Sequence, residues 1–160
     1  MGIRRQFLVR NGTQVQDTIL PANPSGTNES DRELEITVVF TSAEATVAAI
    51  DRAVALLNGL NGRISLVAAQ SVPYPLPLES PPVLLDFNKQ RLIEIASESP
   101  VETTVDLFLC RSRLETLASV LKPGSAVVIG ARRRWWPTWE TRLARGLEYY
   151  GIQVILLDTA

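Results

Sequence analysis

The stretch EITVVF, residues 35–40, followed directly by TSAE, residues 41–44, decides the fold class of this chain. Its β-branched and aromatic residues run almost without a polar break, which is typical of a strand buried on both faces of a parallel sheet. Thr41 or Ser42 can then cap a helix, and Glu44 follows Thr41 at the spacing of a capping box. A buried strand that passes directly into a helix is the first half of a strand–helix–strand unit.

The same alternation of strand and helix patterns continues to the end of the chain. The expected strands are 35–40, 63–70, 101–110, 125–131 and 152–158, and the expected helices are 42–58, 83–98, 112–121 and 137–150. Strands that alternate with helices require crossover connections between parallel strands. The sequence therefore predicts an open, doubly wound α/β domain with a parallel five-stranded sheet and helices on both faces.

Two segments precede this domain, which the pattern confines to residues 35–160. Residues 21–34 are rich in Pro, Asn, Ser and charge, and this composition predicts a linker. Residues 1–20 contain Asn11-Gly12 between two strand-like runs, which favours a two-residue hairpin turn. Because an isolated hairpin is marginally stable in water, this N-terminal extension either docks on the domain or stays poorly ordered.

The composition excludes several kinds of site and partner. The chain of 160 residues has no histidine and one cysteine, so a Ser/His/Asp system, a structural zinc site and an internal disulfide are not expected within it. Its formal net charge of −1 gives no strong signal for nucleic acid. No run approaches the roughly 20 apolar residues of a transmembrane segment. We expect the protein to be cytoplasmic, because unpaired cysteines are usual in that compartment.

Candidate ligand-binding residues follow from the topology. In an open parallel sheet, ligands bind beyond the carboxyl ends of the strands, where the strand order reverses. The segments at this edge are 41–44, 69–72, 110–113 and 130–136. The last of them opens the motif ARRRWWPTWE, residues 131–140. The predicted ligand-binding residues are Thr41, Ser42, Gly130, Arg132, Arg133, Arg134, Trp135 and Trp136.

The three consecutive arginines have two interpretations. Guanidinium groups bind phosphate oxygens through paired, charge-assisted hydrogen bonds, so Arg132–Arg134 would hold a phosphorylated ligand by side chains alone. Alternatively, they form a solvated face that pairs with carboxylates of a neighbouring helix. The segment Arg132–Arg145 carries five arginines and Glu140, a local charge of +4. With exposed tryptophans beside it, such a surface suits a protein partner, a lipid headgroup layer or a nucleotide base.

The tryptophans differ in their expected roles. Trp139 lies on one helical face with Leu143 and Leu147, so we expect its ring in the core. Trp136 precedes the helix and is expected to pack back on it as a hydrophobic staple. No structural role is predicted for Trp135.

Cys110 ends the third expected strand, next to Arg111 and Arg113. Nearby arginines would lower the pKa of its thiol and make it reactive. A cysteine at the end of a buried strand is otherwise a small apolar core residue. The sequence leaves both interpretations open.

The strand spacing, the long irregular segment at residues 71–82 and the fourth strand reading GSAVVIGA, residues 124–131, resemble the universal stress protein family. The resemblance covers about residues 35–158. It implies a flavodoxin-like sheet with strand order 3-2-1-4-5 and frequent homodimers. One branch of that family binds ATP at the carboxyl edge of the sheet, and the resemblance implies the same site here if the chain belongs to that branch.

The ATP-binding branch carries an acidic residue after the first strand and a motif of Gly, two residues, Gly, nine residues, and Gly followed by Ser or Thr. Gly130 fills the first position of this motif. Other residue types occupy the remaining positions: Arg133, Leu143 and Ala144 in the motif, and Thr41 and Ser42 in place of the acid. An arginine cannot reproduce the close approach of a glycine backbone to phosphate. We therefore expect no cofactor, with ATP or another nucleotide as the alternative.

The expected function is that of a non-catalytic, stress-protein-like binding or regulatory module with a degenerate nucleotide site. The alternative is a ligand-binding protein that holds a nucleotide or another phosphorylated molecule through Arg132–Arg134. No P-loop or G-x-G-x-x-G motif is present, and we do not expect an enzyme. The β-prone C-terminal strand Ile152–Asp158 is an expected sheet edge and homodimer contact. A protein partner is expected at the loop that contains the arginines and tryptophans.

Overall fold

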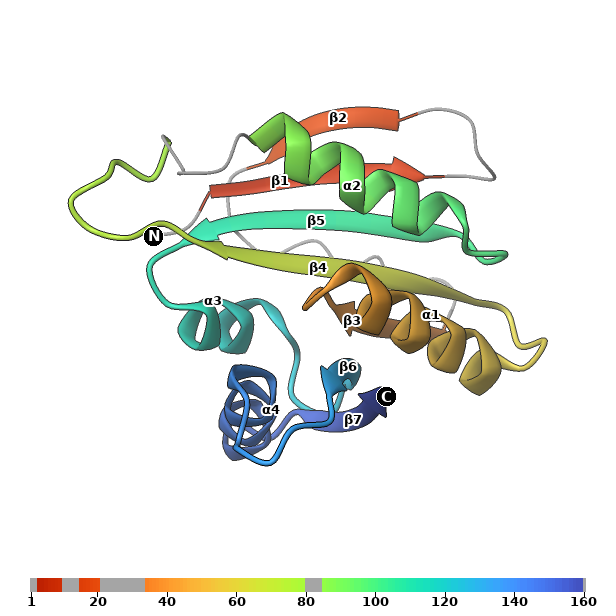
Figure 1. The fold of residues 1–160 in the computed structure, drawn as a ribbon. Helices are drawn as coiled ribbons and strands as arrows, with labels where there is room; N and C mark the ends of the chain where they lie inside the picture. Colours follow the sequence, from red (N-terminus) through yellow and green to blue (C-terminus); the bar gives the residue numbers. More distant parts are fainter. Residues whose placement is uncertain (1–2, 10–14, 21–33, 80–84, 160) are drawn as a thin grey trace.

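The computed structural model describes residues 3–9, 15–20, 34–79 and 85–159, which form a seven-stranded sheet flanked by four helices (Figure 1). The strands are β1 (Ile3–Val9), β2 (Val15–Leu20), β3 (Leu34–Val39), β4 (Gly62–Ser71), β5 (Thr103–Cys110), β6 (Ala126–Arg132) and β7 (Gln153–Thr159). The helices are α1 (Ala43–Leu57), α2 (Leu85–Ser97), α3 (Arg113–Val120) and α4 (Trp139–Tyr149). The strand order is β2-β1-β5-β4-β3-β6-β7.

The five strands from β3 onward confirm the predicted fold class. Their order is β5-β4-β3-β6-β7, and all four neighbouring pairs are parallel. Counted from β3, this is the order 3-2-1-4-5 of a flavodoxin-like sheet. The strand order reverses between β3 and β6, so the carboxyl ends of these two strands and of β4 border the expected ligand crevice.

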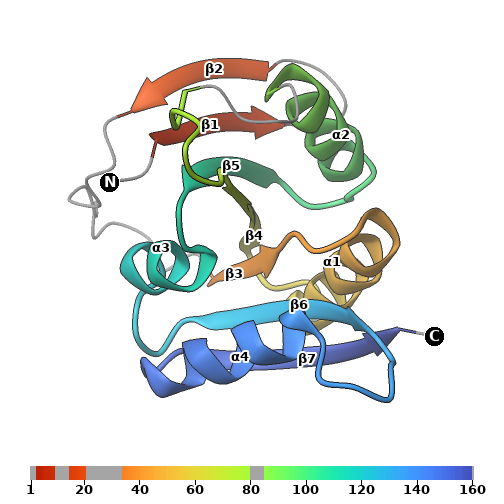
Figure 2. The same ribbon diagram turned by 60° about the vertical axis from the view of Figure 1, so that its left-hand side comes forward.

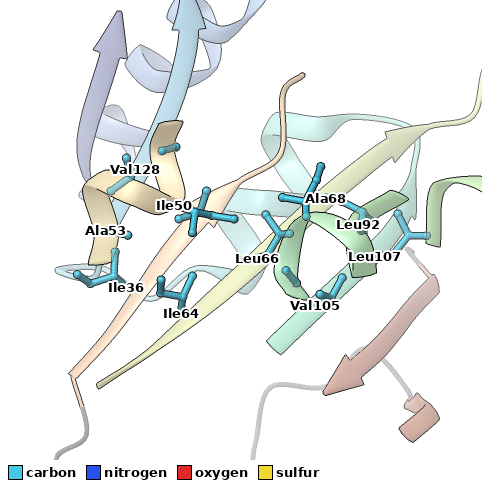
Figure 3. Close-up of a cluster of buried hydrophobic side chains, with 14 of the residues drawn as sticks. Ile36, Ile50, Ala53, Ile64, Leu66, Ala68, Leu92, Val105, Leu107 and Val128 are labelled. Atoms are coloured by element: carbon cyan, nitrogen blue, oxygen red, sulfur yellow. The ribbon is translucent and has the colours of Figure 1, made fainter. Parts of the chain in front are cut away.

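The sheet has a core on each face, because alternate residues of a strand point to opposite sides. Helices α1 and α2 cover one face, and α3 and α4 cover the other (Figure 2). Val38 belongs to the first cluster and Val39 to the second, and both are at most 1% exposed. The first cluster joins Ile36 and Leu66 of the sheet to Ile50 of α1 (Figure 3). Both faces of the central strands are therefore buried, as their unbroken apolar sequences predict.

The N-terminal hairpin docks on the sheet. β1 pairs antiparallel with both β2 and β5, with Phe7 opposite Val105 and Val9 opposite Thr103. Of the two alternatives for the N-terminal extension, the docked hairpin is the one observed. The expected turn at Asn11-Gly12 and residues 21–33 of the expected linker lie outside the described residues.

Helix α1 begins one residue later than a capping box at Thr41 requires. Its N-cap is Ser42, whose hydroxyl accepts a hydrogen bond from the amide of Ala45 at 3.3 Å. The prediction that Thr41 and Glu44 form a capping box is therefore wrong. The Thr41 hydroxyl instead donates to the carbonyl of Gly130 at 2.7 Å, which ties the end of β3 to β6.

Candidate functional site

A cavity of about 270 Å³ opens at the carboxyl edge of the sheet. Phe40 and Thr41 after β3 border it, together with the last residues of β4, helix α2 and the first residues of α3 and α4. Its wall also includes Ala68, Leu92 and Leu107, which belong to the first core cluster (Figure 3). The cavity thus lies where the topology of an open parallel sheet predicts a ligand.

The lining of the cavity is half apolar and carries positive charge. The polar side chains are those of Thr41, Gln70, Ser71, Asn88, Arg91 and Arg113. The apolar ones are those of Phe40, Ala68, Ala69, Leu92, Leu107 and Trp139. None of the residues that the structure places around the cavity is acidic. Two arginines without a carboxylate make the site suited to an anionic ligand that also has an apolar part.

Arg113 is the best positioned of these cations. It is the first residue of α3, and its Nε donates to the carbonyl of Ala69 at 3.1 Å. Its guanidinium carbon lies 4.8 Å from the ring centre of Trp139. The two terminal nitrogens make no hydrogen bond with any residue in the described ranges. The side chain is therefore held at one nitrogen and one face while its remaining donors are available to an anion.

A second cavity of about 280 Å³ adjoins the first. Ser71, Arg113 and Trp139 line both, and the second adds Arg142 and two leucines, one from each of α3 and α4. The stacked Arg113–Trp139 pair therefore stands between the two cavities. A ligand that bridges them would meet a further cation in Arg142.

Trp139 is not a core residue, contrary to the sequence prediction. It is 40% exposed, whereas Leu143 and Leu147 on the same helical face are 5% and 0% exposed. The cause is its position along the helix. As the first residue of α4, Trp139 directs its side chain back past the helix start, beyond the carboxyl ends of the strands and into the crevice.

Gly130 has a packing role that the sequence does not reveal. A Cβ on Gly130 would lie against the carbonyl oxygen of Ala45 and 2.7 Å from its carbonyl carbon. The first turn of α1 therefore sits directly on the backbone of β6, an approach that only glycine permits. Gly130 and Ser42 do not line either cavity that the structure describes here.

Arg132 is engaged with the neighbouring helix. One of its terminal nitrogens lies 2.7 Å from a carboxylate oxygen of Glu44 in the first turn of α1. For this arginine, the pairing with a helix carboxylate that the sequence offered as an alternative is confirmed. The exposed pair leaves its guanidinium outside both cavities.

The rest of the predicted arginine–tryptophan site lies on the surface. Arg133 and Arg134 are exposed and make no side-chain ion pair with any described residue. Trp135 is fully exposed and Trp136 is 78% exposed, so the predicted staple of Trp136 on the helix is wrong. Of the eight residues predicted to bind a ligand, the structure places only Thr41 around the cavities.

Five polar lining residues were not among the predicted site residues. Gln70, Ser71 and Arg113 lie in segments that the crevice rule did indicate, but none of them was singled out. Asn88 and Arg91 come from α2, where the Asn88 amide donates to the side-chain oxygen of Gln70 at 2.7 Å. The available signal was the presence of polar residues in the first half of α2, the helix that follows β4.

Arg111 orders the segment beside the cavity. Its two terminal nitrogens donate to the carbonyls of Val72 and Leu76, each at 2.8 Å. Its guanidinium carbon lies 4.0 Å from the ring centre of Tyr74. Arg111 is thus committed to the chain that follows β4 and holds it in place.

Cys110 is a buried residue rather than a reactive thiol. It is 1% exposed, and burial raises the pKa of its thiol above the ordinary value, although a hydrogen bond with Thr116 and the charge of Arg113 act in the opposite direction. The interpretation of Cys110 as a small apolar core residue is confirmed. At neutral pH the thiol is protonated and shielded from solvent.

The described residues contain no cluster of metal-ligating side chains, and none of their helices is long and apolar enough to cross a membrane. No model of a known protein family matches the chain, and no curated protein is significantly similar to it.

Proposed function

We propose that this protein is a non-catalytic binding or regulatory module that holds a small anionic ligand in the cavity at the carboxyl edge of its sheet. The observation that carries the proposal is Arg113, which lines a partly apolar cavity bordered by no acidic residue of the described chain and whose terminal nitrogens make no hydrogen bond with a described residue. A nucleotide or another phosphorylated molecule has the matching chemistry, an anionic group attached to a larger body.

The nature of the lining supports binding rather than catalysis. Among the described lining residues there is no carboxylate or thiol to act as base or nucleophile. The hydroxyl of Thr41 donates to the carbonyl of Gly130, and that of Ser71 donates to the carbonyl of Arg111. Both hydroxyl groups therefore donate to backbone carbonyls, and no described lining residue offers a side-chain base to activate them.

We propose that the chain is a divergent relative of the universal stress proteins, with a cytoplasmic role in the stress response. The strand order 3-2-1-4-5 with helices on both faces supports this relationship. The packing of Gly130 on α1 gives a physical reason why one glycine persists although the phosphate-binding motif around it is replaced. The free, buried Cys110 is compatible with a reducing compartment.

Calorimetric titration with ATP, AMP and inorganic phosphate tests the proposed function. We expect at least one of the three to bind the wild type, and Arg113→Ala to weaken that binding by about 10- to 100-fold, the usual range for a charge-assisted hydrogen bond. Arg52→Ala, which removes an exposed arginine of α1 that lines neither cavity, is the charge-matched control and should bind as the wild type does.

The same titration distinguishes binding in the cavity from binding by the arginines Arg132–Arg134. Arg133→Ala combined with Arg134→Ala should leave the affinity nearly unchanged, because neither residue borders either of the two described cavities. If this double variant loses binding and Arg113→Ala keeps it, the ligand is held by the loop, as the alternative from the sequence proposes. If none of the three anions binds at millimolar concentration, the proposal of an anionic ligand is wrong.

We also propose a homodimer through β7. Among the described strands, β7 pairs only with β6, and Leu156 on it is 38% exposed. Such an edge presents unpaired backbone groups to a second chain. The amides of Val154 and Ile155 point to opposite sides of the strand, so a proline at one position removes a bond to β6 and a proline at the other removes only an edge donor.

Light scattering at tens of micromolar checks this expectation. The wild type should have the mass of a dimer. One of the two variants, Val154→Pro or Ile155→Pro, should become a folded monomer, while the other loses stability. A wild type that is monomeric at this concentration rules out the β7 contact as a stable interface.

A further inference from the structure

The connection between β6 and α4, residues Arg133–Thr138, forms an exposed surface that the proposed cavity does not use. We call it the Arg/Trp loop; it lies at the margin of the molecule in both ribbon views (Figures 1 and 2). Trp135 is 100% exposed and Trp136 is 78% exposed. Two adjacent, unburied indole rings form an exposed apolar patch, and such patches mark sites of contact with a protein or a membrane.

The ends of the loop are fixed, although its rings are free. The amide of Arg133 donates to the carbonyl of Thr159 on β7 at 3.1 Å. At the other end, the hydroxyl of Thr138 caps α4 by accepting from the amide of Thr141 at 3.4 Å. The tryptophans between these anchors are thus presented on a short, tethered segment, which lowers the entropy lost on binding.

The charge of this surface is positive and local. Counting the arginines of Arg132–Arg145 against Glu140 and the paired Glu44 leaves +3 on a chain whose net charge is −1. Two of these arginines, Arg133 and Arg134, belong to the loop itself and make no ion pair with a described side chain. A partner of this loop is therefore anionic.

A bilayer fits these features better than a protein. A stable protein interface buries about 800 Å² on each side around an apolar centre. The Arg/Trp loop instead offers two rings preceded by cations and followed by Pro137 and Thr138. Tryptophan concentrates at the headgroup level of bilayers, and arginine binds lipid phosphates there, without any need for a complementary shape.

We propose that the Arg/Trp loop docks the protein on an anionic lipid surface, with Trp135 and Trp136 in the headgroup layer and Arg133 and Arg134 on lipid phosphates. An apolar and a basic signal are combined here, and two such signals together give more stable membrane attachment than either one alone. Each basic residue held near an anionic surface raises the partition coefficient about fivefold. The binding is therefore expected to depend on salt and on anionic lipid.

Co-sedimentation with vesicles of phosphatidylcholine alone or with about one third phosphatidylglycerol tests the proposal. The wild type should bind the anionic vesicles and remain in solution with the neutral ones. Arg133→Ala with Arg134→Ala should lower the partition coefficient about 30-fold. Trp135→Ala with Trp136→Ala should lower it about tenfold or more, because the apolar contact is lost.

Two control variants remove the same chemistry elsewhere. Arg52→Ala with Lys122→Ala deletes two exposed cations outside the loop, and Phe87→Ala with Tyr149→Ala deletes two exposed aromatic rings. Both should bind as the wild type does. Tryptophan emission should shift to shorter wavelength on anionic vesicles, and a Trp135→Phe, Trp136→Phe variant, which keeps only Trp139, should not show the shift.

Several results would overturn the proposal. The first is a wild type that stays in the supernatant with anionic vesicles at low salt. The second is a partition coefficient that falls as much in the Arg52/Lys122 control as in the Arg133/Arg134 variant, because the attraction would then not depend on the loop. The third is a wild type that binds an acidic protein but not vesicles, and that loses this protein when Arg133 and Arg134 are replaced by alanine. The partner of the loop would then be the protein expected from the sequence and not a lipid surface.

Discussion

Gly130→Ala is expected to lower the free energy of unfolding by about 3 kcal/mol or more, the upper range for an overpacked core. The added Cβ would meet the backbone of Ala45, which cannot move without shifting α1 away from β6. The hydrogen bond from Thr41 to Gly130 would be disturbed as well. Urea denaturation followed by circular dichroism measures the effect.

Gly146→Ala is the matched control for this substitution. A Cβ on Gly146 would approach the end of the Leu114 side chain at 2.6 Å, and a leucine can change rotamer. Alanine also has a higher helix propensity than glycine by about 1 kcal/mol, so the net change should stay within about 1 kcal/mol. Equal stability losses in the two variants would contradict the close contact between β6 and α1.

Leu147→Ala is expected to cost about 3 kcal/mol, whereas Trp139→Ala is expected to cost about 1.5 kcal/mol. Leu147 is 0% exposed in the second core cluster, so its truncation leaves a cavity. Trp139 is 40% exposed, and its main specific contact is the cation–π stacking with Arg113. Thermal and urea unfolding of the two single variants compare them directly.

The ligand should separate these variants further. Trp139→Ala removes a cavity wall and the support of Arg113, so it should weaken anion binding although the protein remains folded. Leu147→Ala should lower stability and leave the affinity of the folded protein unchanged. If Trp139→Ala unfolds the protein as readily as Leu147→Ala does, the indole belongs to the core, as the helical periodicity predicts.

The fold was predictable because its signals are local. Continuous apolar runs such as residues 35–40 are typical of parallel strands with both faces covered, and Gly59 and Gly151, each at positive φ, end helices at the expected places. The sequence did not decide whether β1 docks on β5. The hydrophobic pattern of β5 does not show which strand pairs with its outer edge.

The site was predictable in its location and only partly in its residues. The crevice rule indicated the segments that hold Thr41, Gln70 and Arg113, because it depends on topology alone. Periodicity assigned Trp139 to the core because it reports the face of a helix and not how far the residue lies along it. Gly130 resembled a remnant of a phosphate loop, since its contact with Ala45 comes from a distant part of the chain.

Chemical-shift mapping of amide signals during titration with AMP tests most directly whether the ligand lies in the cavity around Arg113. We predict that the largest changes fall on the amides of residues 40–41, 69–71, 88–92 and 113, and on the indole N–H of Trp139, all of which border or adjoin the cavity. Changes confined to residues 132–136, or no changes at millimolar AMP, would contradict binding in this cavity.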